Sequence, residues 1–150
     1  MNCTGGTDML QTATHPLAEL LRREVDKFLA VSRRHAEHDL YLGRRSARRH
    51  YRSWPLLVGP LGSGSVRDVS VTLFNASESG LAFRSECEFA VGVELAVKLF
   101  WQDPRGYWMP MVVRHCRPNG RSHVVGCEYT LDDPQACRRA SERRPRWFDA

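Results

Sequence analysis

The pattern of apolar and polar positions divides the chain into a helical part and a longer part typical of β-strands. Between residues 14 and 34, apolar side chains recur every three or four positions, which is the period of an amphipathic helix. Thr14 is placed to cap this helix, and Pro16 is tolerated in its first turn. Because one face is apolar, we expect the helix to pack against the rest of the domain or against a second copy of itself. Polar residues and Gly43 follow.

From residue 54 the pattern changes to short runs rich in β-branched and aromatic residues, separated by turn residues. The runs cover residues 54–58, 66–74, 80–85, 91–100, 107–116 and 122–130. Six short strands with this spacing predict a mainly β fold, an antiparallel barrel or sandwich in one continuous domain. After the strands, Asp133 is placed to cap a short helix that begins at Pro134 and ends before Pro145.

Composition narrows the class of protein. With 150 residues, 42% of them hydrophobic and 26% charged, the chain is long enough for one folded domain with peripheral segments. No apolar run approaches the roughly 20 residues of a membrane span, and the first residues lack the features of a secretory signal, so we expect a cytoplasmic protein. The five cysteines are odd in number and scattered, which is typical of reduced thiols.

Two further features of the composition concern metals and charge. The group His115, Cys116, His123 and Cys127 suggests zinc ligands, but these residues fall in strand patterns where cysteine usually fills apolar space, and we expect no metal. The net charge is +5, with five arginines in residues 44–52 and five more in residues 138–146. This distribution indicates an anionic partner.

Arg48 and Arg52 lie four positions apart just before the first strand. They present two guanidinium groups in one direction whether the segment is helical or extended. Such groups match phosphate oxygens and the O6/N7 edge of guanine. A segment of this kind ahead of a barrel is also typical of a solvated basic stretch, and Arg44 with Arg48 or Arg45 with Arg49 would give other registers of the same spacing.

The sequence NASESG at residues 75–80 lies between two predicted strands. It is typical of a tight β-turn, in which Gly80 permits a positive φ. It also places short polar groups beside exposed backbone amides, which suits a base edge or a phosphate.

Together and in this order, the two motifs resemble those of the PilZ family, in which RxxxR precedes the first strand and [D/N]xSxxG follows about twenty-odd residues later. The sequence HVVGCEYT at 123–130 is similar to the family's last strand, and the resemblance covers residues 44–131. It implies a six-stranded split barrel that binds cyclic di-GMP and needs no cofactor or catalytic residue. Asn75 stands where Asp is commoner, which keeps an acceptor and loses a charge. The implied ligand-binding residues are Arg48, Arg49, Arg52, Asn75, Ser77 and Gly80.

The resemblance also predicts a domain organisation and a mode of signalling. We expect a disordered N-terminus at 1–13, a helix and linker at 14–43, the PilZ-like barrel at 44–131, and a short helix with a basic tail at 132–150. We hypothesise that the ligand pins the arginine segment across the barrel and repositions the helix, which would signal to a downstream protein partner.

Three alternatives remain. An enzyme is the weakest, because no nucleophile–base pattern or phosphate loop is visible. A barrel that binds single-stranded nucleic acid is disfavoured, because Phe74, Phe83, Phe100 and Tyr129 alternate as core residues do. The third is a PilZ fold that no longer binds ligand and acts as a protein-interaction module.

Overall fold

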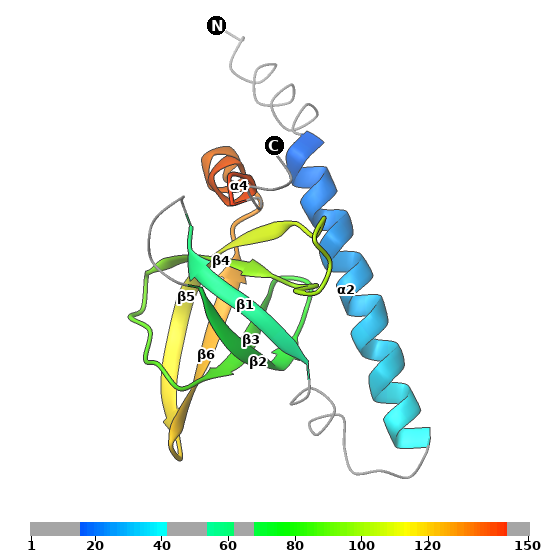
Figure 1. Ribbon diagram of the computed structural model, residues 1–150, viewed down its shortest axis with the longest axis vertical. Coiled ribbons are helices and arrows are strands. Elements are labelled where there is room, and N and C mark those ends of the chain that lie inside the picture. Colours follow the sequence, from blue (N-terminus) through cyan, green and yellow to red (C-terminus); the bar gives the residue numbers. More distant parts are fainter. Residues whose placement is uncertain (1–15, 42–53, 62–67, 144–150) are drawn as a thin grey trace, which may run out of the picture.

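The computed structural model describes residues 16–41, 54–61 and 68–143, with the side chains of the first helix described as far as residue 34. Its elements are α2 (Pro16–Tyr41), β1 (Pro55–Pro60), β2 (Val69–Ala76), β3 (Gly80–Ser85), β4 (Glu94–Lys98), β5 (Trp108–Asn119), β6 (Ser122–Tyr129) and α4 (Pro134–Ser141). The predicted six-stranded antiparallel barrel with an N-terminal and a short C-terminal helix is confirmed (Figure 1). The expected disordered N-terminus and the Thr14 cap lie outside the described residues.

The strands form a closed barrel in the order β1-β2-β3-β6-β5-β4, and each neighbouring pair is antiparallel. Pairing of β1 with β4 closes the barrel, so the sheet has no free edge. Inward-facing side chains fill the interior, among them Leu56, Val58, Leu73, Phe83, Val97, Met109 and Met111, each with no exposed surface. The alternation that predicted the strands therefore arises from this core.

Of the four aromatic residues expected in the core, one is placed differently. Phe83 and Tyr129 are buried, and Phe100 packs against the core. Phe74 is only half-buried, and the guanidinium of Arg84 lies 5.6 Å from the centre of its ring. The reason is that Phe74 follows the inward-facing Leu73, so the alternation of β2 turns its ring to the outer surface of the barrel.

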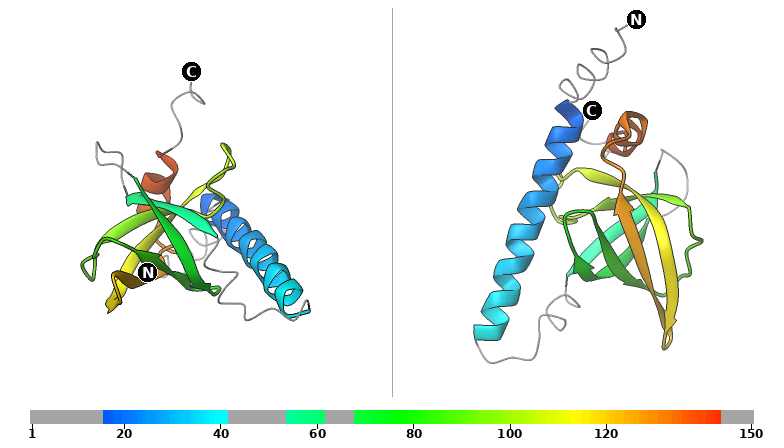
Figure 2. Two further views of the ribbon diagram at one scale, coloured as in Figure 1. Left: turned by 60° about the horizontal axis from the view of Figure 1, so that its bottom comes forward. Right: turned by 180° about the vertical axis from the view of Figure 1, so that it is seen from behind.

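Helix α2 packs its apolar face against one side of the barrel (Figure 2). Leu21, Val25 and Phe28 are fully buried there. The Phe28 ring meets Trp54 edge to face, with 5.1 Å between ring centres, and the Trp54 indole N–H donates to the carbonyl of Leu99 at 3.2 Å. The barrel therefore covers the face that could otherwise have paired with a second copy of the helix.

The helix is longer than expected, since α2 continues to Tyr41 and not only to residue 34. No Gly or Pro interrupts residues 35–41, so nothing in the backbone stops the helix there. The last turns diverge from the barrel in the views of Figure 2. In the part of the chain that the structure describes, no helix has the length and apolar character needed to cross a membrane.

Helix α4 confirms the predicted cap at Asp133 and the predicted end before Pro145. The Asp133 carboxylate accepts hydrogen bonds from the backbone N–H groups of Gln135 at 3.0 Å and Ala136 at 3.3 Å. The helix ends at Ser141, and its small residues pack against Ala96 and Trp108 of the barrel.

Arg143, one of the five C-terminal arginines, is buried against the barrel. Its side chain is only 8% exposed, and its guanidinium lies 4.3 Å from the centre of the Trp108 ring. It forms an ion pair with Asp68 and donates to the carbonyl of Pro60 at 2.9 Å. This arginine therefore ties the C-terminal helix to the opening strands of the barrel.

A buried acid, Glu24, and a buried base, Lys98, influence each other electrostatically where α2 packs on the barrel. Glu24 is 7% exposed and Lys98 is 6% exposed. Burial raises the pKa of Glu24, while Lys27, the backbone N–H of Tyr107 and Lys98 oppose the rise and Asp103 adds to it. Burial likewise lowers the pKa of Lys98, against the attraction of Asp103 and Glu24.

We expect Glu24→Gln to raise the melting temperature at pH 7. The pKa of Glu24 is higher in the folded than in the unfolded protein. Such a group contributes its full stabilisation below the unfolded pKa, and this stabilisation is lost as the pH rises through the folded pKa. The gain should therefore vanish near pH 4, where wild-type Glu24 is protonated in both states. Exposed Glu19→Gln is the control. Lower stability at pH 7 would show that the ionised carboxylate contributes more through Lys27 and Lys98 than its burial costs.

Candidate functional site

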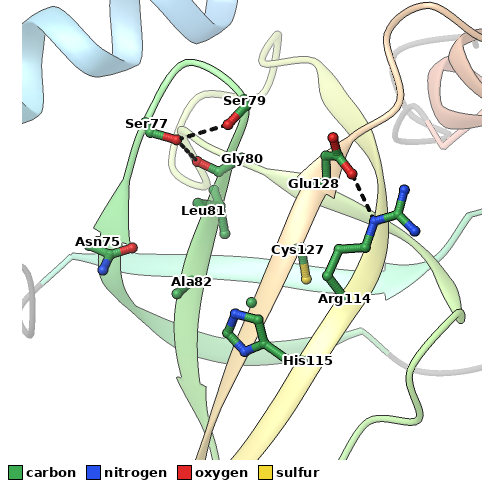
Figure 3. A pocket seen from close by; sticks show the side chains of 11 residues that line it. Asn75, Ser77, Ser79, Gly80, Leu81, Ala82, Arg114, His115, Cys127 and Glu128 are labelled. Atoms are coloured by element: carbon green, nitrogen blue, oxygen red, sulfur yellow. Dashed lines mark hydrogen bonds and ion pairs between the residues drawn. The ribbon is translucent and has the colours of Figure 1, made fainter.

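A pocket of about 280 Å³ opens on the outer surface of the barrel, where the β2–β3 turn meets β3, β6 and β5 (Figure 3). It brings together all three turn residues that the sequence predicted: Asn75, Ser77 and Gly80. The other residues that line it are Ser79, Leu81, Ala82, Arg114, His115, Gly126, Cys127 and Glu128. The predicted arginines Arg48, Arg49 and Arg52 lie outside the described residues.

The turn between β2 and β3 is held by its own hydrogen bonds. The backbone N–H of Ser77 donates to the carbonyl of Gly80 at 2.8 Å, and the Ser77 hydroxyl donates to the same carbonyl at 3.3 Å. The hydroxyls of Ser77 and Ser79 lie 3.3 Å apart. Asn75 is exposed at the end of β2, directly after the register shift of that strand. The turn thus presents its amide and hydroxyl groups from a fixed backbone.

Gly80 is required for a different reason from the one predicted. Among the described residues, positive φ values occur only at Gly92 and Gly120. A Cβ atom on Gly80 would instead overlap the backbone carbonyl of Cys127 on β6. Glycine therefore lets β3 approach β6 closely at the edge of the pocket.

The opposite side of the pocket carries charged residues that the sequence analysis did not single out. Arg114 on β5 and Glu128 on β6 form an ion pair, with 2.7 Å between Nε and Oε1. A register shift between Val113 and His115 leaves Arg114 and His115 both exposed, where strict alternation would bury one of them. The only sequence signal for these residues was the polar end of an otherwise apolar strand.

His115 and Gly126 lie opposite each other on β5 and β6. A Cβ atom on Gly126 would overlap the His115 imidazole, so glycine leaves room for the ring to lie over β6 (Figure 3). Beside them, burial raises the pKa of the Cys127 thiol to about 12, so the thiol stays protonated and unreactive. Within residues 16–41, 54–61 and 68–143, no group of three or more His, Cys, Asp or Glu residues is placed to hold a metal ion.

The pocket is connected to α2 as well as to the barrel. The Arg22 guanidinium of α2 donates to the carbonyl of Glu78, in the middle of the turn, at 3.0 Å. On the other side, the N–H of Tyr129 donates to the carbonyl of Ser79 at 2.9 Å. The turn therefore lies between the helix and the last strand, and a ligand that shifts the turn would act on both.

Comparison with known proteins adds one match to this geometry. A family model described as PilZ domain matches residues 44–143. The match includes the arginine motif, the β2–β3 turn and the whole of α4. No curated protein matches the chain.

Proposed function

Because the chain belongs to the PilZ domain family, whose members typically bind cyclic di-GMP and are generally non-catalytic receptors, we propose that this protein is a receptor for cyclic di-GMP. The observation that carries the proposal is the pocket beside the β2–β3 turn. There the polar groups of Asn75 and Ser77 share one pocket with the guanidinium of Arg114.

The way the chain enters the barrel supports a joint role for the two sequence motifs. The N–H of Leu73 donates to the carbonyl of Trp54 at 2.8 Å, so the residue before β1 lies beside the end of β2. Arg52 comes two residues before Trp54, and two residues of extended chain span at most about 7 Å. This short separation in sequence supports a joint action of the arginine motif and Asn75 on one ligand.

The chemistry of the ligand requires both motifs. Cyclic di-GMP carries two phosphates and two guanines. The guanidinium groups of Arg48, Arg49 and Arg52 would bind phosphate oxygens and guanine O6/N7 in bidentate fashion. Asn75 and Ser77 would bind the ligand from the turn, and Gly80 would keep the turn close to β6.

We propose that binding becomes a signal through the segment 44–52, which joins α2 to the barrel. A ligand changes a conformational equilibrium only by binding one state more tightly. Contacts of the arginines with a ligand in the pocket would favour a state in which the segment crosses the barrel surface. Leu21 and Phe28 are part of the core, so the half of α2 that carries them stays docked. The part of α2 beyond Arg34 is then the element whose position changes for a downstream protein partner.

Titration of the purified protein with cyclic di-GMP by isothermal calorimetry tests the proposal, with GTP as the control. We expect micromolar or tighter binding of cyclic di-GMP and no measurable binding of GTP, which has a guanine and phosphates but lacks the second nucleotide. No heat with cyclic di-GMP would contradict the receptor function and favour a ligand-silent interaction module. Equal affinities for cyclic di-GMP and GTP would show that the pocket recognises only charge.

A further inference from the structure

The ion pair of Arg114 and Glu128 occupies the side of the pocket opposite Asn75 (Figure 3). Glu128 supplies the only carboxylate among the described residues that line the pocket. Its Oε1 accepts from Nε of Arg114, while Oε2 and the terminal nitrogens of Arg114 make no hydrogen bond to described residues. The pair is thus ordered by one contact and keeps further donors and acceptors for a ligand.

We propose that Glu128, oriented by Arg114, is a specificity-determining residue that recognises the Watson–Crick edge of one guanine of the ligand. This inference rests on the proposed binding of cyclic di-GMP and adds residues of β5 and β6 to that site. Neither residue belongs to the two sequence motifs, which lie in the segment before β1 and in the β2–β3 turn.

The hydrogen-bonding groups of guanine match this pair. The Watson–Crick edge presents two donors, N1–H and the 2-amino group, beside the acceptor O6. A carboxylate accepts both donors, and a hydrogen bond to an ionised acceptor is stronger than one to a neutral amide. The Asn75 amide has a single acceptor oxygen beside two donors, so it does not match the two guanine donors with one oxygen each, as a carboxylate does. The terminal nitrogens of Arg114, which make no hydrogen bond to the described residues, are donors for O6.

Charge also decides which part of the ligand lies here. A phosphate placed against the Glu128 carboxylate would be repelled, whereas a base edge that donates hydrogens is attracted. The Glu128 carboxylate therefore favours a base edge, and not a phosphate, on the β6 side of the pocket.

The barrel offers a matched control pair away from the pocket. Arg139 of α4 and Glu94 of β4 also form an ion pair, with 3.6 Å between nitrogen and oxygen, and their side chains are 50% and 51% exposed. The Arg114 and Glu128 side chains are 60% and 49% exposed. Exposed pairs of this kind contribute little to stability, so Glu128→Gln and Glu94→Gln should both fold.

The test combines Glu128→Gln with a ligand that lacks the 2-amino groups, the cyclic dinucleotide with hypoxanthine in place of guanine. Affinities of wild type, Glu128→Gln and Glu94→Gln for both dinucleotides are measured by calorimetry. For cyclic di-GMP we expect Glu128→Gln to lose about 10- to 100-fold in affinity and Glu94→Gln to lose none. Removal of the 2-amino groups should cost the wild type more affinity than it costs Glu128→Gln, because the two changes remove the same contact.

The outcomes separate this inference from the function on which it rests. Absence of wild-type binding to cyclic di-GMP would overturn both. Tight wild-type binding that Glu128→Gln reduces no more than Glu94→Gln does would overturn the role of Glu128 and leave the receptor function in place. Equal losses for both dinucleotides in Glu128→Gln would also overturn it, since the carboxylate would then act without contacting the 2-amino group.

Discussion

Arg52→Ala is expected to lower the affinity for cyclic di-GMP by at least about 100-fold. A bidentate guanidinium contact with phosphate or guanine consists of charge-assisted hydrogen bonds, which contribute about 1.5–3 kcal/mol each, and alanine removes all of them. Arg52 is also the nearest in sequence to Trp54 of the three predicted arginines. Trp54 is held on the barrel by a hydrogen bond with Leu73 and an aromatic contact with Phe28. Of the three arginines, we therefore expect Arg52 to contribute most to binding. Calorimetric titration gives the loss directly.

Arg121→Ala is the matched control for this substitution. Arg121 is exposed in the two-residue turn between β5 and β6, and its loss changes the net charge by the same amount. We expect the affinity of this variant to remain within about twofold of wild type at 0.15 M salt, where charges farther than roughly 8 Å are screened. Similar losses in both variants would mean that the ligand is attracted by overall charge, as in a non-specific nucleic-acid binder.

Phe28→Ala is expected to lower the free energy of unfolding by about 3–5 kcal/mol, the usual cost of removing a buried aromatic side chain. The Phe28 ring is fully buried and contacts Trp54 and Phe100 edge to face, with 5.1 and 5.8 Å between ring centres. Its loss leaves a cavity between the helix and the barrel and removes an aromatic contact of Trp54. Urea denaturation followed by tryptophan fluorescence measures the change.

Leu20→Ala on the same helix serves as the comparison. Leu20 is 38% exposed, so its truncation should cost no more than about 1 kcal/mol. If Phe28→Ala were no more destabilising than Leu20→Ala, α2 would be an arm that detaches easily from the barrel. In that case a ligand could move the whole helix, and not only its end beyond Arg34.

Local chemistry in the sequence was sufficient to predict several features of this protein. Alternation of apolar residues located the six strands, because one face of each strand has to be buried in any closed barrel. The carboxylate before Pro134 identified the start of α4, since capping needs only neighbouring backbone groups. Asn75, Ser77 and Gly80 were recognisable as a turn for the same reason, and the structure places all three at one pocket.

Other features depended on contacts between distant parts of the chain. The register shifts beside Phe74 and Arg114 are set by how neighbouring strands pair, and strict alternation in the sequence gives no sign of them. They expose Asn75 on one side of the pocket and bring Arg114 opposite Glu128 on the other. Strand pairing also determined that Gly80 is needed for close approach and not for its dihedral freedom.

The sequence by itself determined the strands, both helices and the polar turn, because period, capping and turn chemistry act over a few neighbouring residues. Only the tertiary structure decided that α2 covers the barrel and not another copy, that Arg143 is buried on Trp108, and that Glu128 belongs to the pocket. The physical reason is the same in each case. The sequence shows that an apolar face has to be buried and that a buried charge has to be paired. Only the folded chain determines which surface covers the face and which group pairs with the charge.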